Sequence, residues 1–253
     1  MAMRIEADGN DVTTVLLDGA LAAFGTALSA PGTLPAADLA ARAAAWFAAR
    51  CGHPVPVLYA DQRHTSLAFV FGSEGALAAG PHLVGICDAI VTDEPEVALQ
   101  VRTADCLPVV LAGGGAIAIV HAGWRGLAGD VLAAALARFR TDLGVPPPAV
   151  EAVIGVGIGP CHYQVGEEVV ASLARLEAAG ARWRVGDAVD LGAFAAGRIA
   201  ALGVPAERIA RLPGCTACTP GYHSHRRDGA AAGRQWSAIV KTAGERRLAR
   251  GER

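Results

Sequence analysis

Short apolar runs bounded by turn residues dominate the first two thirds of the chain. Their length and β-branched content predict β-strands, and runs that are apolar at consecutive positions predict strands covered on both faces. The predicted strands cover residues 12–17, 55–60, 66–71, 88–92, 97–103, 107–112, 116–121 and 150–158.

Patterns of helical period are interspersed with these strands and dominate the C-terminal third. A helix after Pro35 ends before Gly52, and a second one ends before Gly144, where glycine is a common helix terminator. The predicted helices cover residues 37–50, 127–143, 167–179, 191–202 and 231–249, and residues 213–228 are predicted to be irregular. The mixture predicts an α/β (α+β) chain with one main core. Only the triple proline at 146–148 resembles a linker, and the apolar strand after it argues for a single domain.

Composition narrows the function classes. The 253 residues are 53% hydrophobic and 18% charged, which suits a large core. A net charge of −2 provides no long-range field for nucleic acid or anionic lipid, so neither partner is expected. No apolar run reaches the length of a membrane span and the N-terminal residues lack the apolar stretch of a secretory signal, so a cytoplasmic protein is expected. No heptad or apolar edge predicts an obligate protein partner.

Two polar motifs lie at the ends of neighbouring predicted strands. The segment TADCLP (103–108) opens one strand with Asp105 and Cys106. The segment HAGWRG (121–126) closes the next strand with His121 and leads into a predicted helix. A helix start attracts anions, and Arg125 can add a bidentate contact to a phosphate or carboxylate.

A third motif, DQRHTS (61–66), places His64 between two predicted strands. His64, Cys106 and His121 offer the donors that zinc prefers, and three protein ligands leave a fourth position for an activated water. A second interpretation makes Cys106 a nucleophile and His121 its base. In a third, Cys106 is a core thiol and the histidines bond backbone carbonyls. The spacing alone leaves all three open. In a reducing compartment the six cysteines are not expected to form disulfides.

Two cysteine-bearing motifs follow later in the chain. The segment GVGIGPCHYQVG (155–166) lacks the third glycine of a dinucleotide loop, so we expect a strand that turns into a loop with Cys161 as a structural residue. Cys215 and Cys218 precede HSHRRD (223–228), a combination that suggests zinc although its spacing matches no standard finger. Arg226 is interpreted as an anion-binding or ion-paired side chain.

Five motifs occur in one order over residues 55–240: QRH (62–64), ADCLP (104–108), HAGWRG (121–126), GIGPC (157–161), and HRRD (225–228) with GRQ (233–235). Together they resemble the YfiH family, also called the laccase-domain or polyphenol oxidase family and, more recently, purine nucleoside phosphorylase. The resemblance implies one domain over residues 1–253, with layered mixed β-sheets flanked by helices. It also implies one zinc ion per chain, bound by His64, Cys106 and His121.

The resemblance further implies small-molecule substrates, a purine nucleoside and phosphate. Family activities include phosphorolysis of adenosine, inosine and methylthioadenosine to a free base and ribose 1-phosphate, and adenosine deamination. Deamination needs a group that moves protons, and Asp105 is the nearest candidate in the sequence. Phosphorolysis needs an anion site, for which we select Arg125, with Arg226 and Arg63 as further contacts. Asp105 and Arg125 are therefore the predicted catalytic residues.

Three positions depart from the common family pattern: Arg63 replaces a small apolar residue, Thr65 a glycine, and His162 a cysteine found in many members. None of these changes removes a predicted ligand. The older family label, copper-dependent phenol oxidation, fits the chain poorly. Multicopper oxidases use repeated His-x-His pairs, and this chain has seven histidines and one such pair. Copper could still bind in vitro.

The resulting hypothesis is a cytoplasmic zinc enzyme acting on purine nucleosides. An alternative is a metal-free Cys-His hydrolase or amidase that edits peptidoglycan precursors. A third hypothesis is a protein that binds a metal or nucleoside without turnover.

Overall fold

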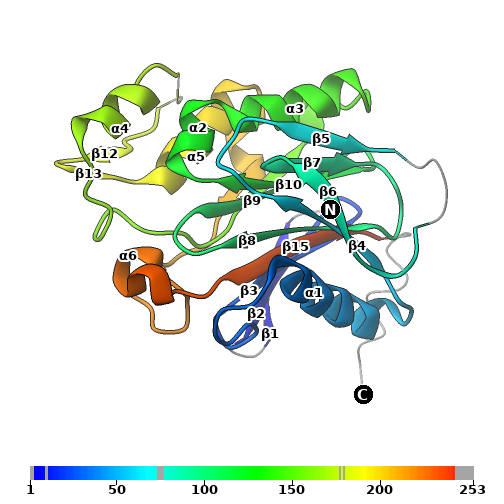
Figure 1. Cartoon of the computed structure of the whole chain (residues 1–253). Coiled ribbons are helices and arrows are strands. Elements are labelled where there is room, and N and C mark those ends of the chain that lie inside the picture. Colours follow the sequence, from blue (N-terminus) through cyan, green and yellow to red (C-terminus); the bar gives the residue numbers. More distant parts are fainter. Residues whose placement is uncertain (1–2, 9–10, 73–76, 177, 179, 243–253) are drawn as a thin grey trace.

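The computed structural model describes residues 3–8, 11–72, 77–176, 178 and 180–242. These residues form four layers: a helix, two β-sheets packed face to face, and a group of helices (Figure 1). The helices are α1 (Ala36–Cys51), α2 (Trp124–Ala128), α3 (Val131–Thr141), α4 (Glu167–Leu173), α5 (Leu191–Ala201) and α6 (His225–Asp228), with short 3-10 turns at Pro147–Ala149, Ala206–Arg208 and Gly229–Ala231.

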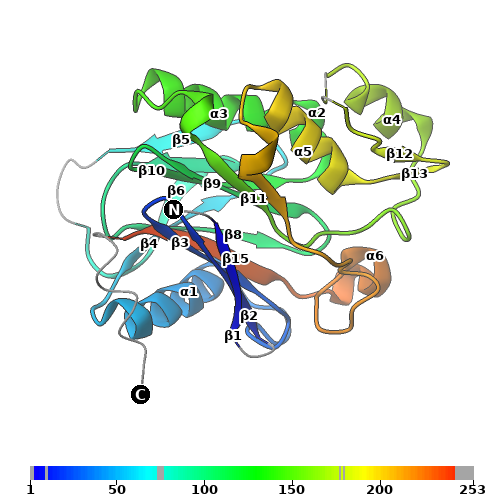
Figure 2. The same ribbon diagram turned by 180° about the vertical axis from the view of Figure 1, so that it is seen from behind.

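The first sheet has seven strands, and helix α1 covers its outer face (Figure 2). Its strand order is β1 (Arg4–Asp8), β2 (Val12–Leu17), β3 (Ala20–Gly25), β15 (Gln235–Lys241), β8 (Ala98–Thr103), β4 (Pro56–Asp61) and β6 (Gly80–Ile86). Strand β4 runs parallel to β6 and β8, and the other neighbours are antiparallel.

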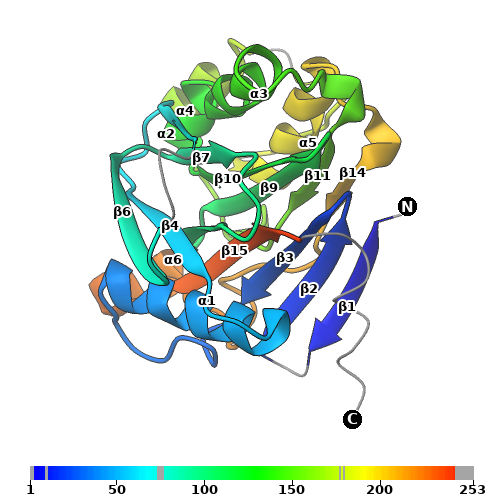
Figure 3. The same cartoon turned by 90° about the vertical axis from the view of Figure 1, so that its right-hand side faces the viewer.

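The second sheet has six strands and carries α3 and α5 on its outer face (Figure 3). Its strand order is β14 (Ile209–Arg211), β11 (Glu151–Ile154), β9 (Leu107–Gly113), β10 (Ala116–Ala122), β7 (Ala89–Thr92) and β5 (Ala68–Phe71). A small ribbon of β12 (Arg184–Val185) and β13 (Ala188–Val189) lies apart from it. Both large sheets mix parallel and antiparallel pairs, which confirms the predicted α/β class with layered mixed sheets.

Apolar side chains fill each interface between layers. Phe24, Leu99 and Ile119 belong to the core between the two sheets, Phe47 packs between α1 and the first sheet, and Phe139 packs between α3 and the second sheet. Strands whose two faces both meet an apolar layer are buried along their whole length, as β9 and β10 are. This burial explains why they appear in the sequence as continuous apolar runs.

The hairpin between β9 and β10 fixes the register on which the functional site depends. Gly114 and Gly115 form its two-residue turn with φ of 56° and 83°, the positive angles that a tight hairpin of this hand needs. The pairing that follows sets Ala122 opposite Leu107 and His121 opposite Pro108. The end of β10 therefore lies beside the segment that leads into β9.

The helix predicted over 231–249 is wrong in its described part. Residues 235–241 form β15, a central strand hydrogen-bonded to β3 and β8, and residues 243–249 lie outside the described residues. Trp236 and Ala238 face α1 while Ile239 faces the second sheet. Burial on both faces and the β-branched Ile239 and Val240 favour the strand.

The helix predicted over 127–143 is two helices. It begins earlier, at Trp124, and breaks between α2 and α3 at Asp130, whose φ is 64°. Asp130 tolerates the left-handed conformation, and its carboxylate accepts two hydrogen bonds from Arg198 of α5. The strand predicted over 150–158 is also shorter, because β11 ends at Ile154. Beyond it, the Gly155 amide still donates to the Pro108 carbonyl of β9, and the Ile158 amide donates to the loop carbonyl of Asp105.

Strands β1, β3, β6, β12, β13 and β14 had no counterpart among the predicted elements. β3 consists largely of alanine, and β6 contains two glycines and a proline, so neither shows the β-branched pattern of a strand. Among the described residues, no helix is long and apolar enough to cross a membrane.

Replacing Phe47 tests the packing of α1 on the first sheet. Phe47 is fully buried, so Phe47→Ala should lower the free energy of unfolding by about 3–5 kcal/mol in denaturant titrations. Leu28→Ala, at a side chain that is 61% exposed, is the control and should change it by less than about 0.5 kcal/mol. Equal effects of the two changes would contradict this packing.

Candidate active site

Strand register brings three segments together at one end of the second sheet. Cys106 precedes β9 and His121 lies at the end of β10, which are hairpin partners. On the other side of β10, strand β7 begins just after Asp88, and the His121 amide donates to the Asp88 carbonyl at 2.7 Å. Backbone pairing thus places Cys106, His121 and Asp88 next to one another.

The predicted ligands His64, Cys106 and His121 form a cluster. One ligand atom from each lies within 4.8 Å of the others. Nε2 of His64 is 3.7 Å from Sγ of Cys106, and the two imidazole rings have their centroids 4.8 Å apart. His64 adopts a φ of 59°, a left-handed conformation that turns its side chain toward the cluster.

The buried carboxylate of Asp88 holds this arrangement. Its Oδ1 lies 2.7 Å from Nδ1 of His121 and accepts from the His64 amide at 3.1 Å. Its Oδ2 accepts from the amide of Thr65 at 2.6 Å, from the Thr65 hydroxyl at 2.7 Å and from the Arg63 amide at 3.2 Å. With Nδ1 of His121 engaged, Nε2 is the nitrogen that remains for the cluster.

These contacts shift three pKa values. Burial raises the pKa of the Asp88 carboxyl, but hydrogen bonds from His121 and Thr65 outweigh it and lower the pKa to about 2. Burial also opposes charge on Cys106, yet hydrogen bonds from His121 and His64 lower its pKa to about 6. Burial lowers the pKa of His121, but hydrogen bonds to Asp88 and Cys106 outweigh this effect and raise the pKa to about 9. The two opposite shifts favour a thiolate beside an imidazolium in the metal-free cluster, and a metal ion bound here would displace the His121 proton.

Gly123 lets the ligands approach the chain closely. A Cβ built at this position would lie 2.8 Å from Sγ of Cys106 and 2.8 Å from Cδ2 of His64. Any side chain at residue 123 would therefore push the two ligands aside. The glycine of the HAGWRG motif is thus explained by the geometry of the cluster itself.

The cluster lies in the wall of a cavity of about 450 Å³. Four arginines and one carboxylate, that of Asp105, line it together with aromatic rings. The lining residues are Gln62, His64, Arg102, Thr103, Ala104, Asp105, Cys106, His121, Trp124, Arg125, Ile158, Tyr163, Leu191, His225, Arg226 and Arg234. The cavity is therefore strongly positive although the chain as a whole has a net charge of −2.

Asp105 lines the cavity with its carboxylate already bonded. One oxygen accepts from the Thr216 hydroxyl at 2.6 Å and the other from the Arg226 amide at 2.6 Å. Its φ of 85° is left-handed, and its carbonyl accepts from the Ile158 amide. These bonds join the segment before β9 to two later loops.

The three predicted anion contacts are placed differently. Arg125 lines the cavity, with its guanidinium 4.4 Å from the ring centroid of Trp124. Arg226 also lines it, over the ring of Tyr163, and donates to the carbonyls of His162 and Gln164. Arg63 is not among the lining residues; its side chain is 64% exposed and pairs with Asp61.

Sequence reasoning missed Asp88 and Arg102, and it gave no role to Arg234 although the GRQ motif contains it. Asp88 was included in a predicted strand, and its one signal is a carboxylate next to a continuous apolar run. Burial lowers the pKa of Arg102. The negative charge of Asp61 opposes this shift, and the positive charge of Arg234 adds to it. Gln62 holds this part of the wall, since its side-chain amide bonds both the amide and the carbonyl of Arg102.

Known proteins resemble the chain in sequence and fold. Residues 36–242 match the family described as "Multi-copper polyphenol oxidoreductase laccase". A protein named "Purine nucleoside phosphorylase" from Xylella fastidiosa (strain Temecula1 / ATCC 700964) is 40% identical over 153 residues, 56% of this chain and 56% of its own. "Adenosine deaminase RL5", from an unknown prokaryotic organism, is 32% identical over 168 residues, 61% of this chain and 62% of its own. The chain thus spans little more than half the length of these curated relatives.

The crystal structure of YlmD from Geobacillus stearothermophilus has the same fold. It superimposes with a TM-score of 0.76 at 26% sequence identity and covers 94% of this chain and 98% of that chain. The family match and this structural agreement confirm the resemblance inferred from the five motifs. The chain belongs to the multi-copper polyphenol oxidoreductase laccase family, the laccase-like YfiH family.

Proposed function

We propose that this protein is a zinc-dependent purine nucleoside phosphorylase that also deaminates adenosine. The observation that carries the proposal is one cavity lined by both the His64, Cys106 and His121 cluster and four arginine side chains. The names of two relatives, a purine nucleoside phosphorylase and an adenosine deaminase, support both the enzyme class and the substrate class.

The donor set fits zinc. Two imidazoles and one thiolate match the three-ligand pattern of catalytic zinc sites, which keep a fourth position open. Asp88 supplies the carboxylate that typically orients a zinc-binding histidine. When bound, zinc supplies Lewis acidity at the wall of the cavity. These residues make no His-rich copper cluster, so the copper in the family's description is not part of the proposal.

The arginine side chains bind phosphate in this proposal. Helix α2 has only five residues, so guanidinium groups rather than a helix dipole supply the positive charge. In phosphorolysis a phosphate oxygen attacks the anomeric carbon of the ribose, and the purine leaves with the electrons of the glycosidic bond. Arg125 and Arg226 would hold the phosphate for this attack, and the rings of Trp124 and Tyr163 offer apolar surface for the base.

Asp105 acts through Arg226 in this proposal. Because its carboxylate bonds the Arg226 amide and the Thr216 hydroxyl, it fixes the loop that carries a phosphate contact. We therefore assign it a positioning role ahead of proton transfer.

A second candidate has geometric support of its own. Cys106, His121 and Asp88 also form the nucleophile, base and orienting carboxylate of a metal-free cysteine hydrolase. The third donor, His64, favours the zinc enzyme because a hydrolase has no use for it.

Turnover of adenosine with and without phosphate tests the proposed function. With phosphate, chromatography should show adenine and ribose 1-phosphate, and without phosphate only inosine should form. Unchanged adenosine at high concentrations of zinc-loaded protein would contradict the proposal. Zinc-free protein that cleaves an amide substrate and is inactivated by a thiol reagent would support the hydrolase instead.

A methyl group at residue 123 should disturb the zinc site. Gly123→Ala would force Cys106 and His64 apart, so zinc affinity in chelator competition should fall at least about 10-fold. The control is Gly221→Ala, where a Cβ meets no atom closer than 4.0 Å and affinity should not change. Wild-type affinity in Gly123→Ala would argue against these ligands.

Loss of one guanidinium should weaken phosphate binding selectively. Arg125→Gln should raise the KM for phosphate at least about 10-fold, because it removes a charge-assisted contact, and leave the zinc content unchanged. Arg138→Gln, which alters an arginine paired with Asp142 on the outside of α3, is the matched control. An unchanged KM for phosphate in Arg125→Gln would remove Arg125 from the proposed site.

A further inference from the structure

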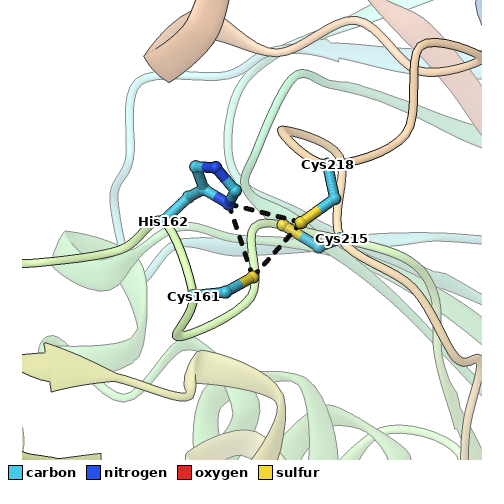
Figure 4. A group of neighbouring side chains, drawn as sticks. All are labelled: Cys161, His162, Cys215 and Cys218. Atoms are coloured by element: carbon cyan, nitrogen blue, oxygen red, sulfur yellow. Dashed lines mark hydrogen bonds between the residues drawn. The ribbon is translucent and has the colours of Figure 1, made fainter.

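A second group of metal-ligand side chains lies outside the cavity lining. Ligand atoms of Cys161, His162, Cys215 and Cys218 all lie within 4.8 Å of one another (Figure 4). The first two residues follow the GVGIG segment, and the other two come from the irregular stretch before α6. Neither the cavity nor the first cluster uses any of them.

We propose that these four side chains bind a structural zinc ion that fastens two loops of the cavity wall together. The proposal does not depend on the activity assigned to the first cluster, and the loss of one zinc ion in Cys218→Ser is expected whatever that cluster binds.

The distances approach those of a tetrahedral site. Sγ of Cys161 lies 3.4 Å from Sγ of Cys218, and Nδ1 of His162 lies 3.4 Å and 3.3 Å from these two sulfur atoms. Zn–S bonds of about 2.3 Å and Zn–N bonds of about 2.0–2.1 Å put neighbouring ligand atoms about 3.6–3.8 Å apart. For these three ligands a shift of a few tenths of an ångström would admit the ion, and Sγ of Cys215 lies within 4.8 Å of each of them. The amide of Gly159 donates to Sγ of Cys215 at 3.1 Å and adds a bond that stabilises a thiolate.

The surroundings do not explain these residues as core packing. Cys161, His162 and Cys218 are exposed, and only Cys215 is buried. The apolar group around Cys215 is small, with Ile158 and Ala217 as its other buried members. Three thiols and an imidazole gathered at a surface satisfy the donor preference of zinc, and four protein ligands leave no position for substrate. Such closed sites are structural.

The sequence suggested a different grouping for Cys215 and Cys218. The His-x-His pair that follows these cysteines is not part of their cluster. Nε2 of His223 lies 2.8 Å from the Ala30 carbonyl oxygen, and His225 lines the cavity. The partners are instead Cys161 and His162, more than fifty residues earlier in the chain. This separation explains why the spacing matched no standard zinc motif.

The loops that the site joins carry part of the cavity wall. Tyr163, which lines the cavity, directly follows His162. Arg226, also in the wall, donates to the carbonyls of His162 and Gln164, and the Thr216 amide donates to the Gly157 carbonyl. A zinc ion across these loops would hold Tyr163 and Arg226 in place without touching the substrate.

Zinc content measured by elemental mass spectrometry tests the proposal. Protein purified without added metal should contain two zinc ions per chain. Cys218→Ser should contain one, as should Cys106→Ala, and the double variant should contain none. Cys218→His replaces one zinc ligand with another and should restore the second ion, whereas Cys51→Ser, outside both clusters, should keep both. Loss of the second ion should also lower the thermal midpoint.

A second measurement leaves the second cluster intact, so it tests the proposal even if Cys218→Ser does not fold. Cys106→Ala loaded with Co²⁺ should show thiolate-to-cobalt charge transfer and the intense visible bands of tetrahedral Co²⁺. Absence of these bands, equal zinc in Cys218→Ser and wild type, or a disulfide between Cys161 and Cys218 in protein purified under reducing conditions would each overturn the proposal. Activity of the first cluster is not needed for any of these readouts.

Discussion

A single buried carboxylate, Asp88, organises the end of the sheet where the site lies. It bonds the ring of His121 and the backbone of residues 63–65, so it joins the end of a central strand to the loop between β4 and β5. Burying a charge is costly unless hydrogen bonds compensate for it, and here they hold the pKa of Asp88 at about 2. The carboxylate thus remains ionised, and its bonds set both the tautomer of His121 and the strained backbone of His64.

The cavity concentrates positive charge in a chain that is nearly neutral overall. The whole-chain balance of 22 basic and 24 acidic residues says nothing about the charge of one cavity. Four guanidinium groups around a single carboxylate, which is itself committed to Thr216 and Arg226, make a local site for a small anion. The metal-ligand cluster lies in the same wall, so a metal ion bound there would face the space that the arginines line.

The sequence predicted the parts of the fold that have strong local signals. The strands from 88 to 121 were found because burial on both faces leaves continuous apolar runs. β15 was not, although it contains the β-branched Ile239 and Val240, because its place in the sheet is decided by long-range pairing with β3 and β8. Among site residues, motif resemblance selected His64, Cys106 and His121, whereas Asp88 and Arg102 depend on strand register, which no local pattern specifies. Arg63 shows that proximity in sequence can also mislead. It is next to a predicted ligand in the chain, yet its side chain turns outward and bonds Asp61.

The central claim is that Asp88 holds His121 and the loop of His64 in a geometry that binds zinc. Zinc affinity of Asp88→Asn, measured by chelator competition, tests it most directly. The control is Asp61→Asn, which changes an acidic residue at the end of β4, just before the loop of His64. The account predicts that the zinc affinity of Asp88→Asn is about 10–100-fold lower than that of the wild type, and that the zinc affinity of the control is unchanged. Wild-type affinity in folded Asp88→Asn protein would contradict it.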